Sequence, residues 1–481
     1  MEIQRNIMVK GDGDRLTNLP EPILLHILSM LPDGKQVVQT STLSKQCRFL
    51  WKSVPLSLNF PFPKYPYDSN INSKKILAFV ASTNRELHYW RSCEKIKAFR
   101  VFPYKYREYL AKDVDFWVHF ATKIANVEEF TLKFYWTRYP DYAYKFPQFA
   151  YRNTSLRNLV LGNCQLNPTG SVNWSSLVNL SIGDVALPEG VMEKVLSGCP
   201  NLECLELDKV GGIRRLEINS VKLKKLIITN YQTEVAEEVV YCLEIFAPYV
   251  RHLELLGLCC YGIRFQLRNM ASLVTAVLSL SVDFYELEGE KDRLEKECRY
   301  FQELLHSVAH VENLELGPWC IECLSILELK GWLFPTSSWK FLKLNAALEQ
   351  LDYPGICSFL QSSSDLETLV FDWNNHKPRD LLSRYPNEDE QSKRFRTHNF
   401  NCSLLHLKTI KIINFDGPPL SGNKSVVPLV KFLLKNATVL EKFVIAVKFE
   451  GSDVSQDHVK MAQEVQSFPR SSPHASVVFP Y

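Results

Sequence analysis

The 481-residue sequence contains no run of 18 apolar residues, and its first residues, Met1 to Arg15, lack the apolar core of a signal peptide. A membrane-spanning helix needs about 20 mostly apolar residues, so neither a membrane span nor secretion is expected. The thirteen cysteines are odd in number and have no framework spacing, which predicts reduced thiols rather than disulfides. We therefore expect a location in the cytoplasm, the nucleus or both.

An excess of charge of one sign is also missing. The 56 Lys and Arg residues nearly balance the 53 Asp and Glu residues, and no block of five or six like charges occurs. Nucleic acids and anionic membranes are recognised by concentrated positive charge. The sequence therefore predicts no nucleic-acid partner and no membrane partner.

Motifs for catalysis and metal binding are absent as well. The sequence has no Gly-x-Ser-x-Gly elbow, no His-Glu-x-x-His and no kinase signature, and its 11 histidines are dispersed. Cys320 and Cys323 have zinc-ligand spacing, but a structural zinc site needs four ligands and no second pair stands nearby. We predict a non-enzyme with no catalytic residue, cofactor or metal. A hidden active site built from distant residues is left as an open alternative.

The length argues for more than one domain. A single core stops growing at roughly 250–300 residues, and hydrophobic residues make up 46% of this chain, enough to fold. Several domains or an extended repeat array are expected.

A first helix is predicted near the N-terminus. Asn18 is expected to cap it, Pro20 and Pro22 fit its first turn, and Pro32 ends it. Its apolar residues recur at helical spacing and form one wide face: Leu19, Ile23, Leu24, Ile27, Leu28 and Leu31.

Two more short helices follow. One begins near Asp33 and buries Val37 and Val38, and the next runs from about Thr42 to Trp51. Three such helices make a very small core, so part of their apolar surface is expected to bind another protein. The alternative is that they only cap the next domain.

This block resembles a plant-type F-box. More than ten positions agree in order and spacing, over about a tenth of the chain. The matching residues are Leu19-Pro20, Ile23-Leu24, Ile27-Leu28-Ser29, Leu31-Pro32, Thr40-Ser41, Leu43-Ser44-Lys45, Arg48 and Leu50-Trp51. In that family the first helix and the segment after it dock on a Skp-type adaptor, which connects to a cullin and a RING subunit.

The resemblance implies which residues bind the adaptor. They are Leu19, Pro20, Ile23, Leu24, Leu28 and Leu31, with Trp51 supporting or joining them. One departure is that Cys47 stands where these sequences usually have tryptophan. Because a large aromatic contact often dominates binding energy, we expect a lower adaptor affinity or a restriction to particular adaptor paralogues.

The rest of the chain repeats the pattern apolar-x-x-apolar-x-apolar. Intervals of about 21 to 31 residues dominate, with one short interval near 10. The copies begin at Ile96, Val127, Leu156, Leu177, Leu202, Ile213, Leu223, Val250, Val311, Leu366 and Leu407, with weaker copies at Leu273 and Trp339. This period is typical of leucine-rich repeats. In the copy at Leu156, Cys164 occupies the step after the strand that satisfies backbone groups at the turn.

Stacked repeats bury a continuous core and line a concave face with a parallel sheet, which suits recognition of a protein target. Helices such as Asp113 to Ala125 and Val191 to Leu196 are expected on the convex side. A purely structural array is the alternative. The residues expected to be exposed on the strands have mixed charge and indicate no ligand class: Arg157, Asn158, Glu203, Arg214, Arg215, Lys224, Lys225, Arg251 and His252.

The C-terminal region predicts a strand from Leu404, a helix from Val427 to Asn436 and a strand around Phe443, which would close the array. This segment resembles the FBD domain of plant F-box proteins, although the Trp and Pro motif that usually precedes that domain is missing. We expect residues 376–401 to form a loop and the chain after Glu450 to be frayed.

Together these observations predict an α/β protein. Its parts are an F-box domain at residues 12–58, a linker with one helix at 59–95, a leucine-rich-repeat solenoid at 96–400, an FBD-like cap at 401–450 and a flexible tail at 451–481.

The resemblance implies a non-catalytic substrate-recognition subunit of a Skp-cullin-F-box (SCF) ubiquitin ligase, with a protein target on the repeats. One alternative is an adaptor-bound F-box protein that acts outside a cullin ligase. Another is a co-receptor that holds a small molecule on the repeat array.

Overall fold

The computed structural model consists of two compact units, Met1–Leu202 and Glu203–Tyr481, each of which is described by itself. The residues that the structure describes are 19–31, 33–45, 47–62, 73–91, 93, 95–134, 143–231, 241–259, 263–282, 291–345, 348–373, 404–415, 426–447 and 456–479. The predicted cap Asn18 and the predicted loop 376–401 lie outside these ranges.

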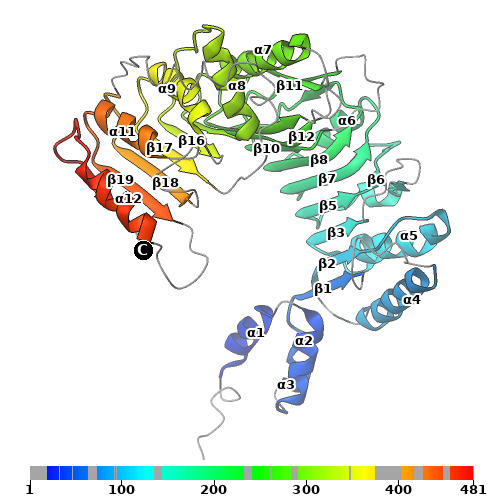
Figure 1. Ribbon diagram of the computed structural model, residues 1–481. Helices are drawn as coiled ribbons and strands as arrows, with labels where there is room; N and C mark the ends of the chain where they lie inside the picture. Colours follow the sequence, from blue (N-terminus) through cyan, green and yellow to red (C-terminus); the bar gives the residue numbers. More distant parts are fainter. Residues whose placement is uncertain are drawn as a thin grey trace, which may run out of the picture. The chain divides into compact units, whose positions relative to one another are not determined.

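The first unit begins with short helices (Figure 1, blue). They are α1 (Glu21–Ser29), α2 (Gly34–Gln39), the 3₁₀ helix η1 (Thr40–Thr42) and α3 (Cys47–Leu50). Pro20 and Pro22 stand at the start of α1, as predicted, and Asp33 caps α2 by accepting a hydrogen bond from the Lys35 N–H. The predicted third helix from Thr42 to Trp51 is wrong in length, because a turn at Leu43 divides it into η1 and α3.

Five parallel strands of the first unit pair in chain order: β1 (Leu56–Pro61), β2 (Ile96–Phe102), β3 (Glu129–Lys133), β5 (Asn158–Gly162) and β7 (Asn179–Ala186). The helices of this part are α4 (Ser73–Trp90), η2 (Glu108–Leu110), α5 (Ala111–His119), the π-helical turn η3 (Phe120–Ile124), η5 (Gln148–Tyr151) and α6 (Val191–Ser197). Two short strands, β4 (Tyr144–Lys145) and β6 (Cys164–Gln165), pair separately. Three of the predicted helices are therefore confirmed, as α4, α5 and α6. The predicted linker at 59–95 contained no strand, but β1 extends into it and pairs with β2.

Ten parallel strands of the second unit also pair in chain order. They are β8 (Cys204–Gly211), β10 (Lys225–Thr229), β12 (His252–Cys259), β14 (Thr275–Val282), β15 (Asn313–Leu316), β16 (Phe341–Asn345), β17 (Thr368–Asp372), β18 (Thr409–Phe415), β19 (Lys442–Val447) and β20 (Ser476–Val478). The helices are α7 (Lys291–Ser307), α8 (Pro318–Leu329), η6 (Gln350–Asp352), α9 (Tyr353–Gln361), α11 (Val427–Asn436) and α12 (Gln456–Ser467). α8 packs against α7 and α9 (Figure 1) and also against β14.

The register explains the sequence period. Leu205, Leu226 and Leu253 stand opposite one another on β8, β10 and β12, and all are fully buried. Alternate side chains of a strand point to opposite faces, so one face of the sheet builds the core and the other stays accessible. The weaker copies at Leu273 and Trp339 are confirmed as β14 and β16.

One repeat was assigned to the wrong sheet. The copy at Ile213, which follows its neighbour by the short interval, contains β9 (Arg215–Glu217). β9 pairs with β11 (Tyr241–Phe246), which pairs with β13 (Ile263–Arg268) in a separate three-stranded sheet. Arg214 and Arg215 therefore do not belong to the face of the large sheet.

Residues with positive φ angles recur at the same register position, within or directly after several strands. Asn163, Lys209, Asn230 and Asn414 adopt positive φ angles of 50–56°, and Gly257 has φ 80°. The Asn230 side chain donates a hydrogen bond to Asp208, and the Asn414 side chain donates to Asp372. The buried Cys164 thiol donates to the Gly162 carbonyl at 3.5 Å, as the sequence predicted for the step after the strand.

The C-terminal strand, helix and strand are present as β18, α11 and β19. The prediction of a flexible tail after Glu450 is wrong, because α12 packs on α11 and β20 extends the sheet beside β19. The apolar side chains of Met461 and Val465 on α12 are fully buried, and this burial stabilises the segment.

Candidate functional site

The helices α1 to α3 enclose a small apolar core. It is made of Leu24, Leu28, Val37, Cys47, Leu50, Val54 and Leu56. Leu24 and Leu28 are one turn apart on α1 and point inward together. Because this core is small, the apolar side chains that remain outside it cannot be covered by the same helices.

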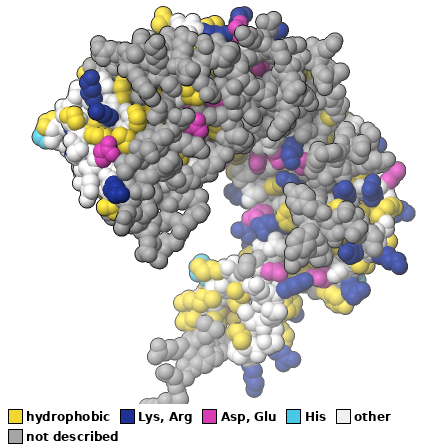
Figure 2. Space-filling model, viewed as in Figure 1, with side chains coloured by type: hydrophobic (Ala, Val, Ile, Leu, Met, Phe, Trp, Pro, Cys, Tyr) yellow, Lys and Arg dark blue, Asp and Glu magenta, His cyan; other side chains and the backbone are white. Residues whose placement is uncertain are grey.

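Beside its buried face, α1 carries exposed apolar side chains. Ile23, Ile27 and Met30 follow one another at helical spacing, and Leu43 and Phe49 add exposed side chains from the turn and from α3. We call these five residues the apolar patch. Hydrophobic side chains gather on this part of the molecule in the space-filling view (Figure 2). Arg48 and Lys52 each lie over the Phe49 ring at 5.6 Å, so cations flank part of the patch.

The predicted adaptor-binding residues divide into three groups. Pro20 and Ile23 are exposed, as the prediction requires. Leu24 and Leu28 are 2% and 7% exposed, so their predicted place on the surface is wrong; they hold α1 on the core instead. Leu19, Leu31 and Trp51 are partly buried and pack against the core.

Sequence reasoning missed most of the apolar patch. Ile27 stood on the predicted apolar face and was part of the F-box pattern, but it was not chosen. Met30, Leu43 and Phe49 are also absent from the predicted adaptor-binding residues. The signal that could have found them is that they are apolar but do not belong to the helical spacing of the core residues. Cys47 is 3% exposed, so a tryptophan at this position would enter the core rather than extend the patch.

Two side-chain contacts join the F-box helices to α4 of the first repeat, and α2 also packs against β1. Lys35 on α2 forms an ion pair with Glu86 on α4 at 3.0 Å. Trp51 meets Trp90, the last residue of α4, with ring centroids 6.3 Å apart. These contacts are within the first unit and give the F-box a defined position on β1 and α4.

The accessible face of the second unit's sheet carries ion-paired clusters. Glu254 on β12 lies 2.7 Å from Lys225 and 2.7 Å from His252. Burial raises the pKa of Glu254, but the hydrogen bonds and positive charge of Lys225 and His252 lower it by more, so the pKa lies below its ordinary value. Of the predicted exposed residues in this unit, Glu203, Lys224 and Arg251 are exposed, and Lys225 and His252 are partly so.

A second cluster lies on β15 to β17. Lys343 is 3.3 Å from Glu315 and 3.2 Å from Asp372. Although partial burial lowers the pKa of Lys343, the two carboxylates raise it above its ordinary value. A face with alternating paired charges can discriminate between protein partners by charge complementarity.

Three other features to consider among the described residues are a metal site, a reactive cysteine and a membrane-spanning helix. No group of three or more His, Cys, Asp and Glu side chains there could hold a metal ion. Burial raises the pKa of the Cys320 thiol to about 12, and this thiol donates to the Leu278 carbonyl at 3.2 Å. In the same part of the chain, no helix is long and apolar enough to cross a membrane.

Comparison with known proteins agrees with this architecture. The F-box domain model matches residues 16–59, and a model described as the At1g61320/AtMIF1 LRR domain matches residues 90–468. The chain is an F-box protein with a leucine-rich-repeat domain, and it belongs to the plant F-box/LRR-repeat family. The second match runs through the segment predicted to be FBD-like, and the FBD likeness itself stays a prediction.

Relatives in Arabidopsis thaliana share both parts. Putative F-box/LRR-repeat protein At3g18150 is 28% identical over 448 residues, which cover 92% of this chain and 88% of the relative. F-box/LRR-repeat protein At3g03360 is 27% identical over 479 residues, covering 96% and 90%. F-box/LRR-repeat protein 25 is 30% identical over 249 residues, covering 52% of this chain and 88% of the relative.

Proposed function

We propose that this chain is the substrate-recognition subunit of an SCF-type ubiquitin ligase. Its F-box binds a Skp-type adaptor and through it a cullin and a RING subunit, and its repeats bind the protein to be ubiquitinated. The observation that carries this proposal is the apolar patch of Ile23, Ile27, Met30, Leu43 and Phe49, which the core leaves exposed. Several exposed apolar side chains on one small helical domain favour a surface that binds a partner.

The mechanism is tethering. The chain holds target lysines near the charged conjugating enzyme, which raises their effective concentration. Chemistry then occurs on other subunits. The two ion-paired clusters on the accessible sheet face support target binding there, because such a face favours one complementary charge pattern over others.

We also propose a location in the cytoplasm or the nucleus. The ten cysteines whose side chains the structure describes are free thiols. Free thiols on this scale are typical of reducing compartments.

The test is co-purification with Skp-type adaptors and a cullin. An Ile23→Asp, Ile27→Asp variant changes only exposed positions of the patch, so it should remain folded. The matched control is Leu77→Asp, which changes an exposed apolar residue on α4 outside the F-box. We expect the wild type and the control to bring down adaptor and cullin, and the patch variant to lose both.

Two other outcomes are informative. Adaptor without cullin supports the alternative role outside a cullin ligase. No adaptor binding by the wild type, across several paralogues, rejects the proposal. Arg48 and Lys52 lie beside Phe49 of the apolar patch, and salt screens exposed charges. We therefore expect adaptor binding to weaken as the salt concentration rises.

A further inference from the structure

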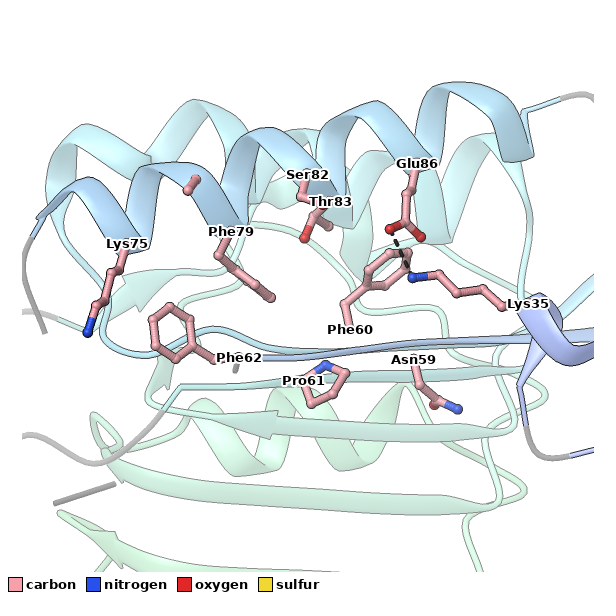
Figure 3. Close-up of a pocket in the computed structure, with 11 residues that line it drawn as sticks. Lys35, Asn59, Phe60, Pro61, Phe62, Lys75, Phe79, Ser82, Thr83 and Glu86 are labelled. Carbon is pink, nitrogen blue, oxygen red and sulfur yellow. Dashed lines mark hydrogen bonds and ion pairs between the residues drawn. The ribbon is translucent and has the colours of Figure 1, made fainter. Parts of the chain in front are cut away.

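A cavity of 540 Å³ lies between the F-box, β1 and α4 of the first unit (Figure 3). Lys35 of α2, residues Asn59 to Phe62 of the β1 segment, and one face of α4 from Lys75 to Glu86 line it. Its volume is in the range of sites for small organic ligands, which are about 300–1,000 Å³. The three parts of the chain that meet here are held together by the Lys35–Glu86 ion pair at one end.

Three phenylalanines form the aromatic part of the cavity wall. Phe60 and Phe62 come from the strand segment, and Phe79 comes from the facing helix. Phe62 and Phe79 meet in a T-shaped contact with ring centroids 5.4 Å apart. Rings arranged in this way pack well against another flat aromatic ring, by stacking or by edge-to-face contact.

One polar group in the wall lacks a partner. Thr83 is 2% exposed, and its hydroxyl has no hydrogen-bond partner among the described residues. Figure 3 shows this hydroxyl pointing from α4 toward the strand. By contrast, the buried Thr122 hydroxyl donates to the Val118 carbonyl at 2.7 Å. A buried polar group without a partner is costly, so the Thr83 hydroxyl favours a ligand that supplies one.

The strand beside the cavity is a poor site for an added peptide strand. The Leu56 N–H donates to the Lys95 carbonyl and the Phe62 N–H donates to the Phe102 carbonyl, both on the β2 side of β1. The backbone groups of the residue next to Phe62 therefore point to the other side, the free edge of the sheet. Pro61 is that residue, and it has no N–H to donate. Proline on an edge is a device that blocks strand addition. The cavity therefore fits a small molecule better than an extended peptide.

We propose that this cavity binds a small organic molecule with a flat aromatic body and one hydroxyl or carbonyl group that hydrogen-bonds to Thr83. The site would lie within the first unit, at the joint between the F-box and the first repeat. The inference does not depend on the proposed ligase function, because it rests only on the cavity walls and on the Thr83 hydroxyl.

The test uses the full chain and two probes of similar shape, 2-naphthol and 2-methylnaphthalene, in equilibrium dialysis. We expect 2-naphthol to bind with a Kd below about 1 mM. Thr83→Val keeps the shape of the side chain and removes the hydroxyl, so it should weaken 2-naphthol binding about tenfold and leave 2-methylnaphthalene binding unchanged.

A second pair of variants locates the site. Ala78→Trp places a large ring on a residue that lines the cavity and should abolish binding of both probes. Leu77→Trp adds the same ring at the preceding position of α4, which is exposed and does not line the cavity, and should leave binding of both probes intact. Thermal unfolding of each variant shows whether it is folded. The proposal is overturned if neither probe binds the wild type, if Ala78→Trp binds as the wild type does, or if Thr83→Val affects both probes equally.

Discussion

The indole rings of Trp51 and Trp90 meet edge-on, with centroids 6.3 Å apart and planes at 85°. Trp51 directly follows α3 of the F-box, and Trp90 ends α4 of the first repeat. Both rings pack against the F-box core without being fully buried. Trp51 therefore links the F-box to the repeats, a role that the adaptor-binding prediction did not include.

Replacing Trp90 with Ala should weaken this link. An aromatic pair contributes about 0.5–1.5 kcal/mol beyond the area that it buries, so we expect a loss of about 2 kcal/mol in the free energy of unfolding. Urea unfolding measures the loss, and hydrogen exchange should increase in α1 to α3. Tyr89→Ala is the matched control, because Tyr89 is the preceding residue and is 71% exposed. Equal effects of the two substitutions would contradict the proposed role of the pair.

Adjacent residues on α1 should separate folding from binding. Leu24 is 2% exposed and Ile23 is 46% exposed. Leu24→Ala opens a cavity in the core and should cost about 2–5 kcal/mol of unfolding free energy. Ile23→Ala should cost less than about 1 kcal/mol of stability yet weaken adaptor binding, because it truncates the apolar patch. Denaturation and adaptor affinity are measured on both variants; if Ile23→Ala binds like the wild type, the patch is not the docking surface.

The same two residues show where sequence reasoning ends. The spacing of apolar residues located α1, but Ile23 and Ile27 fit the helical period as well as Leu24 and Leu28 do. Which pair faces inward depends on where Val37, Cys47 and Leu50 lie, and those positions come from the packing of three helices. A local pattern therefore predicted the helix correctly and the binding face only in part.

The repeats were more predictable than the F-box surface, since each strand carries its own pattern. The exception is β9: its sequence satisfies the same pattern, but it pairs with β11 in a separate three-stranded sheet, and the pattern of a strand does not specify which sheet the strand joins. The Thr83 cavity gave no sequence signal at all. It exists because β1, α2 and α4 meet, and no segment encodes that meeting by itself.

The backbone of β12 at Gly257 should be sensitive to a single methyl group. Gly257 has φ 80°, and a Cβ built on it would lie 2.3 Å from the Asn230 side-chain oxygen. Gly257→Ala therefore combines backbone strain with a clash and should cost about 2–4 kcal/mol. Gly331→Ala is the matched control, because Gly331 has φ 71° but nothing within 4 Å of the new Cβ. We expect the control to lose only about 1 kcal/mol, as strain alone requires. Urea midpoints of the two variants decide this, and similar midpoints would mean that the contact with Asn230 is unimportant.

The cluster around Glu254 should make stability depend on pH in the acidic range. The folded-state pKa of Glu254 is lower than the ordinary value of 4.5, so its pairing with Lys225 and His252 stabilises the protein above that value. The contribution is lost as the pH falls through the lower, folded-state pKa, because protonation removes the charge. At neutral pH, Glu254→Gln should lower the free energy of unfolding by about 1 kcal/mol, a modest amount because the pair is partly exposed.

Below the folded-state pKa the wild type and Glu254→Gln should have the same stability. Urea unfolding at a series of pH values, from neutral to well below the ordinary pKa of 4.5, measures the difference between their free energies of unfolding. Glu206→Gln, which alters the same register position on β8, is the control. Its difference in stability from the wild type should not shrink as the pH falls. A Glu254→Gln deficit that persists unchanged in acid would mean that the side chain stabilises the sheet through packing rather than through its charge. The Lys225–Glu254–His252 cluster would then be available to a charged target at little cost to the fold.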